Sequence, residues 1–310
     1  MKVHAFVPAA QPDWVQASVY SYYRLVERII VSYDRDGLGW NGKPMPVDTT
    51  LALLRDMDID NKMVFCPGNY FRPNHAPHEN ATYQRQCALD EAGDNANWVL
   101  MFDTDEVLAD PVMFKSCLEQ AHTEGFDGLH YPARWLYQYL GRGWFLEMCS
   151  RFWGIAASYP GPVAIRPRTR LTHHRQCDVS LFRVDFKPRN TDPWHRPDAT
   201  VNRVIGADQG IIHYSYVRRP EYLEKKFANH GEFHNPERSR KVVHWEWCAR
   251  HPYLASARTP LALRRYGQRH LRPVRITAPN DYALRELNEL NGTDNPNPTH
   301  AKALVEADRQ

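Results

Sequence analysis

Residues 98 to 106 read Trp98-Val99-Leu100-Met101-Phe102-Asp103-Thr104-Asp105-Glu106. Five apolar residues without a polar break are typical of a strand that is buried on both faces of a parallel sheet. Acidic residues follow directly, at the end of the strand where open α/β sheets bind their ligands. In an extended backbone Asp103 and Asp105 would point to the same side. We therefore expect this segment to be the central strand and the start of the functional site.

Segments of strand and helix character alternate on both sides of this stretch. Apolar and β-branched runs predict strands at residues 3–7, 28–33, 62–66, 127–131 and 210–216. Helical patterns lie between them, at residues 12–25, 47–57, 80–92 and 110–125. In the last of these, Asp110 is the expected N-cap, Pro111 the first helical residue and Gly125 the stop. The alternation predicts an α/β fold, with a mostly parallel sheet flanked by helices. Beyond about residue 135 the pattern weakens, and we expect loops and irregular strands there.

The composition is that of a globular protein with balanced charge. The 310 residues include 39 Lys and Arg against 36 Asp and Glu, and 43% are hydrophobic. These values argue against disorder and against nucleic-acid binding by the chain as a whole. The six cysteines form no C-x-x-C pair, so we expect buried thiols rather than disulfides or a zinc site. No apolar run approaches the ~18 residues that span a bilayer, and we expect a cytoplasmic protein.

The acids after the strand have the chemistry of a metal site. Two carboxylates on one side of a strand end repel each other but suit a hard divalent cation, Mg²⁺ or Mn²⁺, which prefers oxygen ligands. Such an ion keeps positions open for diphosphate oxygens and stabilises a departing nucleoside diphosphate. Asp103 and Asp105 are therefore the candidate metal ligands. The alternative without a function is a turn at the strand end whose acidic side chains are solvated.

The arrangement resembles the GT-A (Rossmann-like) fold of family 2-like glycosyltransferases. The matching pieces are residues 29–34, Arg85 with Ala88 and Leu89, residues 98–106, and Asp110. The resemblance covers residues 1–135 well and residues 213–231 loosely. It implies a metal-dependent hexosyltransferase-like enzyme that moves a sugar from a UDP- or GDP-sugar to an acceptor hydroxyl, in glycan or glycoconjugate synthesis.

The same resemblance implies positions for the donor-binding residues. Asp34 or Asp36 would lie near the nucleotide base, and Arg85 would lie close to the donor, with an exposed charge on the helix surface as an equal alternative for Arg85. Asp103 and Asp105 would face the diphosphate through Mn²⁺ or Mg²⁺. Many members of the family carry consecutive acids followed by Gly-Ser where this chain has residues 33–37, so the choice between Asp34 and Asp36 stays open.

His213 lies in the apolar run 210–216, near the end of the region with alternating strands and helices. Several GT-A enzymes take a third metal ligand or a diphosphate contact from a histidine in such a place, and a core histidine with its hydrogen bonds satisfied is an equal alternative. Four cations follow it and could bind diphosphate or lie on a helix surface. They are Arg218, Arg219, Lys225 and Lys226.

A transfer that inverts the anomeric centre needs a general base on the acceptor side. Glu147 is our candidate because it is the acid of an aromatic and apolar segment, residues 144–148. A buried ion pair with Arg142 or Arg151 is an equal alternative for it. Competing bases are Asp192, Asp198 and Asp208. A stacking wall for an acceptor sugar, or else core packing, would come from Trp135, Tyr137, Trp144 and Trp153.

These expectations divide the chain at residue 235. Residues 1–235 would form the GT-A domain, with a nucleotide-sugar half at 1–135 and an acceptor half at 136–235. Residues 236–310 would form a helical C-terminal extension with a basic stretch, residues 258–275, and a flexible tail. The basic stretch is either a solvated face or a patch for anionic lipid or a phosphate-rich acceptor, which leaves contact with the inner membrane face open. The acceptor (glycan, lipid-linked or protein) and the oligomeric state stay open too.

Two other functions compete with sugar transfer. A sugar nucleotidyltransferase also places acids on an α/β sheet, but it usually carries a loop with Gly and basic residues after its first strand, and residues 8–13 contain neither. A non-catalytic carbohydrate- or polyanion-binding module would use the aromatic residues and the basic stretch. A hydrolase using Asp103 and Glu106 is a weaker alternative, because nothing fixes the two acids across a substrate.

Overall fold

The computed structural model describes residues 1–159, 161–193, 195–196, 198–219, 222–223, 237–259 and 270–292, with the backbone alone for residues 237–242 and 292. Lys225, Lys226, most of the basic stretch and the tail beyond residue 292 lie outside these ranges. Within them, none of the helices has the length and apolar character needed to cross a membrane. All six cysteines are free thiols; Cys117, Cys149 and Cys248 are buried as expected, whereas Cys66, Cys87 and Cys177 are partly exposed.

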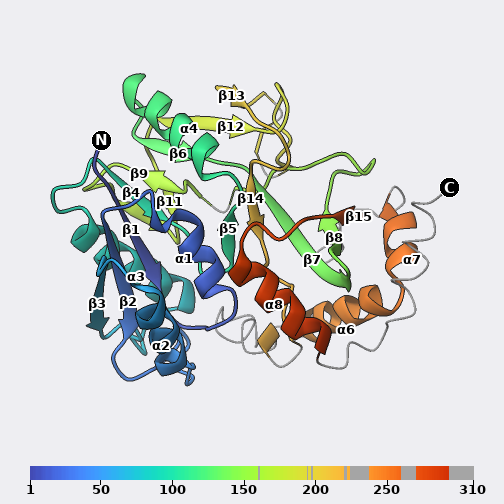
Figure 1. The fold of residues 1–310 in the computed structure, drawn as a ribbon, viewed down its shortest axis with the longest axis horizontal. Helices are drawn as coiled ribbons and strands as arrows, with labels where there is room; N and C mark the ends of the chain where they lie inside the picture. The colour runs from blue at the N-terminus through green and yellow to red at the C-terminus, as the bar shows by residue number, and fades with distance from the viewer. Residues whose placement is uncertain are drawn as a thin grey trace.

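The larger sheet has eight strands in the order β13-β12-β6-β9-β4-β1-β2-β3 (Figure 1). Their bounds are β1 Val3–Pro8, β2 Arg28–Asp34, β3 Met63–Gly68, β4 Trp98–Met101, β6 Gly128–His130, β9 Ala164–Ile165, β12 Leu181–Asp185 and β13 Arg203–Val204. Only β9 runs antiparallel to its neighbours, β4 and β6; the other pairings are parallel. The predicted α/β class with a mostly parallel sheet is confirmed.

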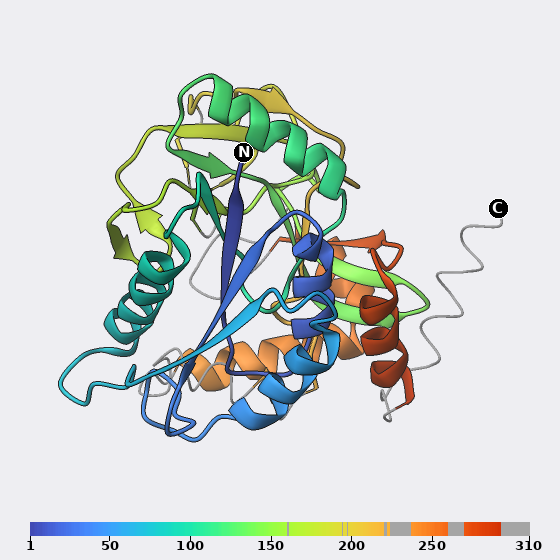
Figure 2. The ribbon, with the colours of Figure 1, turned by 60° about the vertical axis from the view of Figure 1, so that its left-hand side comes forward.

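Helices cover both faces of this sheet (Figure 2). Strand residues alternate in direction, and because both faces are buried the strands can be apolar throughout. Phe6, Val99 and Met101 pack with Leu89 of α3 (Pro77–Ala92) on one face. The residues between them, such as Leu100, pack on the other face. This second layer consists of α1 (Val15–Tyr23), α2 (Val47–Met57) and α4 (Pro111–Thr123).

Local signals set the ends of several helices. The carboxylate of Asp110 caps α4, since its Oδ1 accepts a hydrogen bond from the backbone N–H of Met113 at 2.9 Å. Gly125 follows this helix with φ +79°, a left-handed conformation that glycine adopts without strain. Helix α1 begins three residues after the predicted start at Pro12, because Trp14 takes a left-handed conformation (φ 66°).

A second, five-stranded sheet has the order β15-β8-β7-β14-β5. Its strands are β5 Glu106–Leu108, β7 Ala133–Gly141, β8 Trp144–Met148, β14 Ile211–His213 and β15 Leu271–Arg275. The expectation of irregular structure beyond residue 135 is wrong for β7 and β8, which form an antiparallel hairpin. Most residues of β7 are buried, so the strand lacks the apolar–polar alternation that would have revealed it.

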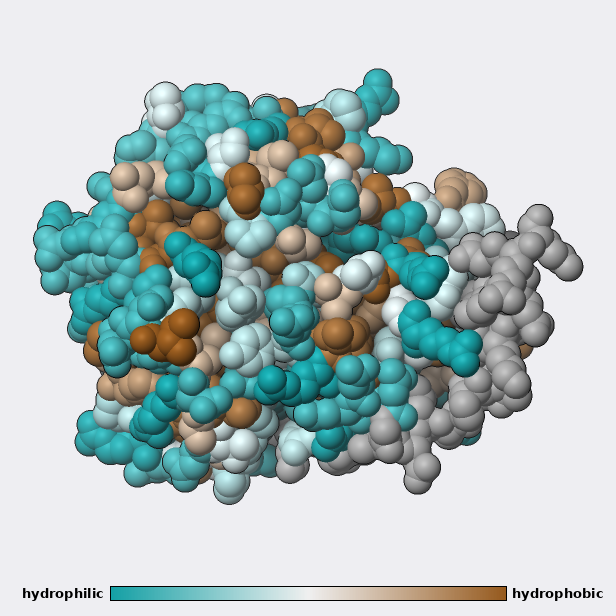
Figure 3. All heavy atoms as spheres, in the orientation of Figure 1, coloured by the Kyte–Doolittle hydropathy of each residue, from teal (hydrophilic) through white to brown (hydrophobic). Residues whose placement is uncertain are grey.

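The C-terminal region contains α6 Glu237–Arg250, α7 Pro252–Ala257 and α8 Asp281–Gly292. It is not helical alone, because β15 pairs antiparallel with β8 of the second sheet. Helix α8 contributes Ala283 and Leu287 to an apolar cluster with Trp14 and Ala17 of the first part of the chain. The surface on the face shown in Figure 3 is largely hydrophilic, with hydrophobic residues scattered over it, the usual distribution for a water-exposed face.

Candidate functional site

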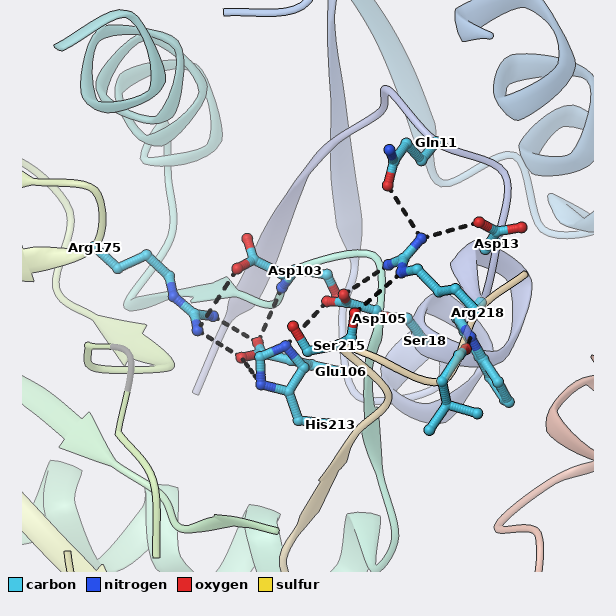
Figure 4. A network of polar contacts seen from close by, with 12 residues as sticks. Gln11, Asp13, Ser18, Asp103, Asp105, Glu106, Arg175, His213, Ser215 and Arg218 are labelled. Atoms are coloured by element: carbon cyan, nitrogen blue, oxygen red, sulfur yellow. Dashed lines mark hydrogen bonds and ion pairs between the residues drawn. The ribbon is translucent and has the colours of Figure 1, made fainter. Parts of the chain in front are cut away.

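Strand β4 ends at Met101, and β5 of the second sheet begins at Glu106. Between them the backbone turns: the N–H of Glu106 donates to the carbonyl of Asp103 at 3.1 Å, and the N–H of Asp103 donates to Glu106 Oε2 at 3.0 Å. The expectation of an extended backbone here is therefore wrong. We call residues 103–106 the acidic turn. Its Asp103 and Asp105 face different partners (Figure 4), because a turn rather than a strand separates them.

Asp103 faces two arginines. Arg85 of α3 donates from Nη2 to Asp103 Oδ1 at 2.7 Å, and Arg175 Nη2 lies 3.9 Å from Asp103 Oδ2. Burial alone would raise the pKa of Asp103, but the positive charges of Arg85 and Arg175 outweigh it and hold the pKa well below its usual range. The Asp103 side chain is still 28% exposed. It is thus an ionised carboxylate that a ligand can reach.

Arg175 holds the acidic turn through an ion pair with Glu106. Its two terminal nitrogens each lie 2.6 Å from a carboxylate oxygen of Glu106, and Nη1 also donates to the carbonyl of Met101. Both side chains are almost fully buried. This bidentate pair links the loop after β10 (Leu171–His173) to the end of β4. The sequence analysis did not single out Arg175, which is 69 positions from its partner and in no motif.

Asp105 is the centre of a second set of contacts. Arg218 donates from Nη2 to Asp105 Oδ2 at 2.7 Å, and its Nη1 lies 3.0 Å from both Gln11 Oε1 and Asp13 Oδ2 (Figure 4). The Arg218 side chain is 1% exposed. It therefore ties the segment after β14 to the loop after β1. Arg219, the neighbouring cation, instead lies near Glu289 of α8 at 3.6 Å.

His213 completes this set from β14, where it pairs with Glu106 in the sheet register. Its Nε2 lies 3.2 Å from Asp105 Oδ1, and the ring stacks on Trp135 with centroids 5.1 Å apart. Among the described residues its buried Nδ1 has no hydrogen-bond partner, although Glu106 Oε1 lies 3.9 Å away. The predicted proximity of His213 to the acidic motif is thus present in the fold.

The donor set of Asp105 and His213 fits a divalent cation. The 3.2 Å between Asp105 Oδ1 and His213 Nε2 is close to the ~3 Å expected between adjacent ligands of a six-coordinate ion bound at about 2.1 Å. Metal-bound histidines usually donate their other ring N–H to a carboxylate, and Glu106 lies next to the orphaned Nδ1. Within the described ranges, no three His, Cys, Asp or Glu side chains are grouped to hold a metal. Any ion here would therefore be shared with a ligand or water.

The two acids after β2 differ sharply. Asp34 is buried, and its carboxylate accepts backbone hydrogen bonds from Asp36 and Leu38 on one oxygen and from Tyr70 and Phe71 on the other. It shapes the loops after β2 and β3. Asp36 is exposed. Of the two candidates for a base contact, Asp36 is the one that a ligand can reach.

Arg85 has hydrogen-bonding capacity beyond its pair with Asp103. It is 4% exposed, and its guanidinium lies 4.9 Å from the centre of the Trp40 ring. Its Nε and Nη1 are buried with no acceptor in the described part of the chain. Buried donors are rarely left without acceptors. Arg85 therefore has two donors without an acceptor among the described residues, beside the partly exposed carboxylate of Asp103.

Glu147 lies in a different environment from the one we expected. One carboxylate oxygen accepts from Arg134 Nε at 2.5 Å, and the other accepts from Arg272 at 2.8 and 2.9 Å. The side chain has no exposure. A hydroxyl could not reach it without opening the second sheet. Glu147 is therefore an ion-pair residue, although its partners are Arg134 and Arg272 rather than Arg142 or Arg151.

The remaining candidates are spread over the acceptor side. Trp135 and Tyr137 lie on β7 and pack with Tyr216, whereas Trp153 is 42% exposed. Asp198 and Asp208 are exposed, and Asp198 pairs with Arg196. Asp192 is buried and pairs with His195 at 2.6 Å. Of the four aromatic residues, Trp135 and Tyr137 thus contact a common ring, and Trp153 lies exposed.

No family model matches the sequence, and no curated protein does. Among solved structures, the chain is similar to 4-diphosphocytidyl-2C-methyl-D-erythritol synthase from Anaerococcus prevotii, with 12% identity, 65% of this chain and 92% of that chain covered, and a TM-score of 0.34. Mannose-1-phosphate geranyltransferase from Thermus thermophilus gives 14% identity, 48% and 49% coverage, and a TM-score of 0.28. Mannose-6-phosphate isomerase from Helicobacter pylori gives 8% identity, with 54% of this chain and 61% of that chain covered and a TM-score of 0.28. TM-scores this low carry no argument about activity.

Proposed function

We propose that this protein is a glycosyltransferase with a GT-A-type site, which takes a sugar from a UDP- or GDP-sugar. One observation carries the proposal: the acidic turn lies at the carboxyl end of β4, with a reachable, ionised Asp103 on one side and the Asp105–His213 pair on the other. This edge of a parallel sheet is where such folds bind nucleotides. Residues 1–135 would supply the donor half and residues 136–235 the acceptor half.

The residues have distinct roles in this proposal. Arg85 would bind diphosphate oxygens through its unpaired Nε and Nη1, and Asp103 would hold its guanidinium in place. Asp36 would contact the nucleotide. Asp105 and His213 would hold Mn²⁺ or Mg²⁺, which as a Lewis acid stabilises the charge of the diphosphate leaving group. Glu106, Arg175 and Arg218 would keep the turn rigid, as a preorganised site requires.

A sugar nucleotidyltransferase is less well supported by the loop after β1. Such an enzyme needs backbone N–H groups and cations in that loop to bind a triphosphate. Here Gln11 and Asp13 direct oxygen acceptors to Arg218. The loop thus presents negative charge and a buried ion pair instead of a phosphate cradle.

Calorimetric titration of UDP, GDP and their sugar conjugates, with and without Mn²⁺, tests the proposal. Wild type should bind one nucleotide series in a metal-dependent manner. Asp105→Asn should lower that affinity at least about tenfold, or ~1.4 kcal/mol, because the ion loses a charged ligand. The matched control is Asp94→Asn, which changes an exposed acid in the turn before β4, at the opposite edge of the sheet.

His213→Gln is a second variant that leaves the Asp105–Arg218 ion pair in place. It should weaken the metal-dependent part of binding as Asp105→Asn does. Absence of nucleotide binding by folded wild type, or binding that Mn²⁺, Asp105→Asn and His213→Gln all leave unchanged, contradicts the proposal and favours a carbohydrate- or polyanion-binding module.

A further inference from the structure

The sheet brings a second group of polar residues to the same edge as the acidic turn. Strand β6 runs in the direction of β4, since β9 between them is antiparallel to both, and β12 is parallel to β6. The carboxyl ends of β4, β6 and β12 therefore share one edge. His130 ends β6 and Asp185 ends β12. The loop after β12 contains Asp192 and His195.

Asp192 and His195 form a close pair. His195 Nδ1 lies 2.6 Å from Asp192 Oδ2, the Asp192 side chain is 1% exposed, and the His195 side chain is 32% exposed. Asn190 steadies this loop, because its Nδ2 donates to the carbonyl of Asp192 at 2.8 Å while its Oδ1 accepts from the N–H of Asp192 at 3.1 Å. A buried carboxylate on Nδ1 favours the tautomer with the proton there, and so leaves Nε2 with a lone pair.

Two rings form the wall against which His195 packs. His130 and Tyr159 meet the His195 ring edge-on, with centroids 5.5 and 5.7 Å away. Burial lowers the pKa of His130 to about 3, with further contributions from His195, Arg183 and Arg175, so His130 is neutral near pH ~7. Arg175 is also the bidentate partner of Glu106. The Asp192–His195 pair lies in the loop after β12, whose carboxyl end is at the same edge of the sheet as the acidic turn.

We propose that His195, oriented by Asp192, is the general base of an inverting sugar transfer. The inference rests on the proposed function and replaces Glu147 in that role. His195 Nε2 takes the proton of the acceptor hydroxyl as its oxygen bonds to the anomeric carbon. The bond from that carbon to the diphosphate breaks, and its electron pair leaves with the nucleoside diphosphate. Asp192 stabilises the imidazolium that forms, as a carboxylate does in other dyads with histidine.

The test measures release of UDP or GDP from the nucleotide sugar that binds in the titration. The acceptors are water and then a panel of p-nitrophenyl hexosides. His195→Gln should slow release by about 10²- to 10⁴-fold, the range for loss of a general base, with donor affinity unchanged. Asp192→Asn should slow it as well. Imidazole in the buffer should restore part of the activity of His195→Ala, which a purely structural histidine would not permit. His173→Gln, an exposed histidine on β10, is the matched control.

The two proposals fail in different ways. Wild-type release rates in a folded His195→Gln variant that still binds the donor overturn the base and leave the proposed function intact. Lack of donor binding by wild type overturns both. If the donor binds but no acceptor supports turnover, ¹⁵N NMR of the histidine rings decides. The proton of neutral His195 on Nδ1 supports the proposal, and the proton on Nε2 overturns it.

Discussion

Asp103 and Glu147 are both carboxylates held by two arginines, yet their positions give them different capabilities. Glu147 sits inside the second sheet with both oxygens engaged by Arg134 and Arg272, and it has no exposure. Asp103 lies at the edge of the first sheet and is 28% exposed. Its partner Arg85 has two further N–H donors with no acceptor among the described residues. Charge pairing is common to the two clusters. Access at the sheet edge is what distinguishes a ligand site from a structural ion pair.

The largest effect should come from breaking the buried cluster. Glu147→Ala leaves Arg134 and Arg272 without their carboxylate, and we expect a loss of about 3–5 kcal/mol in the free energy of unfolding. Urea denaturation measures it. Glu91→Ala, which removes an exposed pair with Arg28, is the matched control and should cost no more than about 1 kcal/mol. Equal losses in the two variants would show that Glu147 is not the buried anchor described here.

Glu286 on α8 sharpens the comparison, because it is a partly buried acid that makes no ion pair with any described residue. Burial and the nearby Asp13 raise its pKa from 4.5 to about 7, against the weaker lowering effects of the Trp14 N–H and Arg218. A folded pKa above the unfolded value stabilises the fold at low pH, and this contribution is lost as pH rises from about 4.5 through about 7.

Glu286→Gln should therefore be more stable than wild type at high pH. We expect a gain of about 2 kcal/mol at pH ~8 that vanishes near pH ~4, measured by urea denaturation at both pH values. Glu119→Gln, at an exposed acid on α4, serves as the control and should show no such dependence. A gain that is the same at both pH values would contradict the raised pKa.

The smallest effect should distinguish Arg85, which contacts Asp103, from Arg272, which contacts Glu147. Arg85→Lys keeps a positive charge near Asp103 but loses the planar fork that could bind diphosphate, so donor affinity should fall about fivefold, or ~1 kcal/mol. Arg272→Lys should lower stability and leave donor affinity unchanged. Calorimetry and urea denaturation measure the two quantities. If Arg272→Lys lowered donor affinity and Arg85→Lys did not, the placement of the ligand beside Asp103 would be contradicted.

Much of the first sheet could be predicted, because its signals are local. Continuous apolar runs such as residues 98–102, the N-cap of Asp110 and the stop at Gly125 each depend on a few neighbours in the chain. The position of Asp103 and Asp105 after the central strand placed them at the ligand edge for the same reason. The β7–β8 hairpin was missed, because a strand buried on both sides carries no alternating pattern.

The amino-acid sequence alone determined the α/β class, most of the helices and strands of residues 1–131, and residues 103–106 as the candidate site, since propensities and short motifs act over a few residues. Only the tertiary structure decided which charges meet. Glu106 pairs with Arg175, Asp105 with Arg218 and Glu147 with Arg272, across 69, 113 and 125 positions of the chain. Asp192 and His195 are only three positions apart, but their proposed role depends on their place at the same sheet edge as the acidic turn. Such pairings follow from how the two sheets pack, and packing is a property of the whole chain.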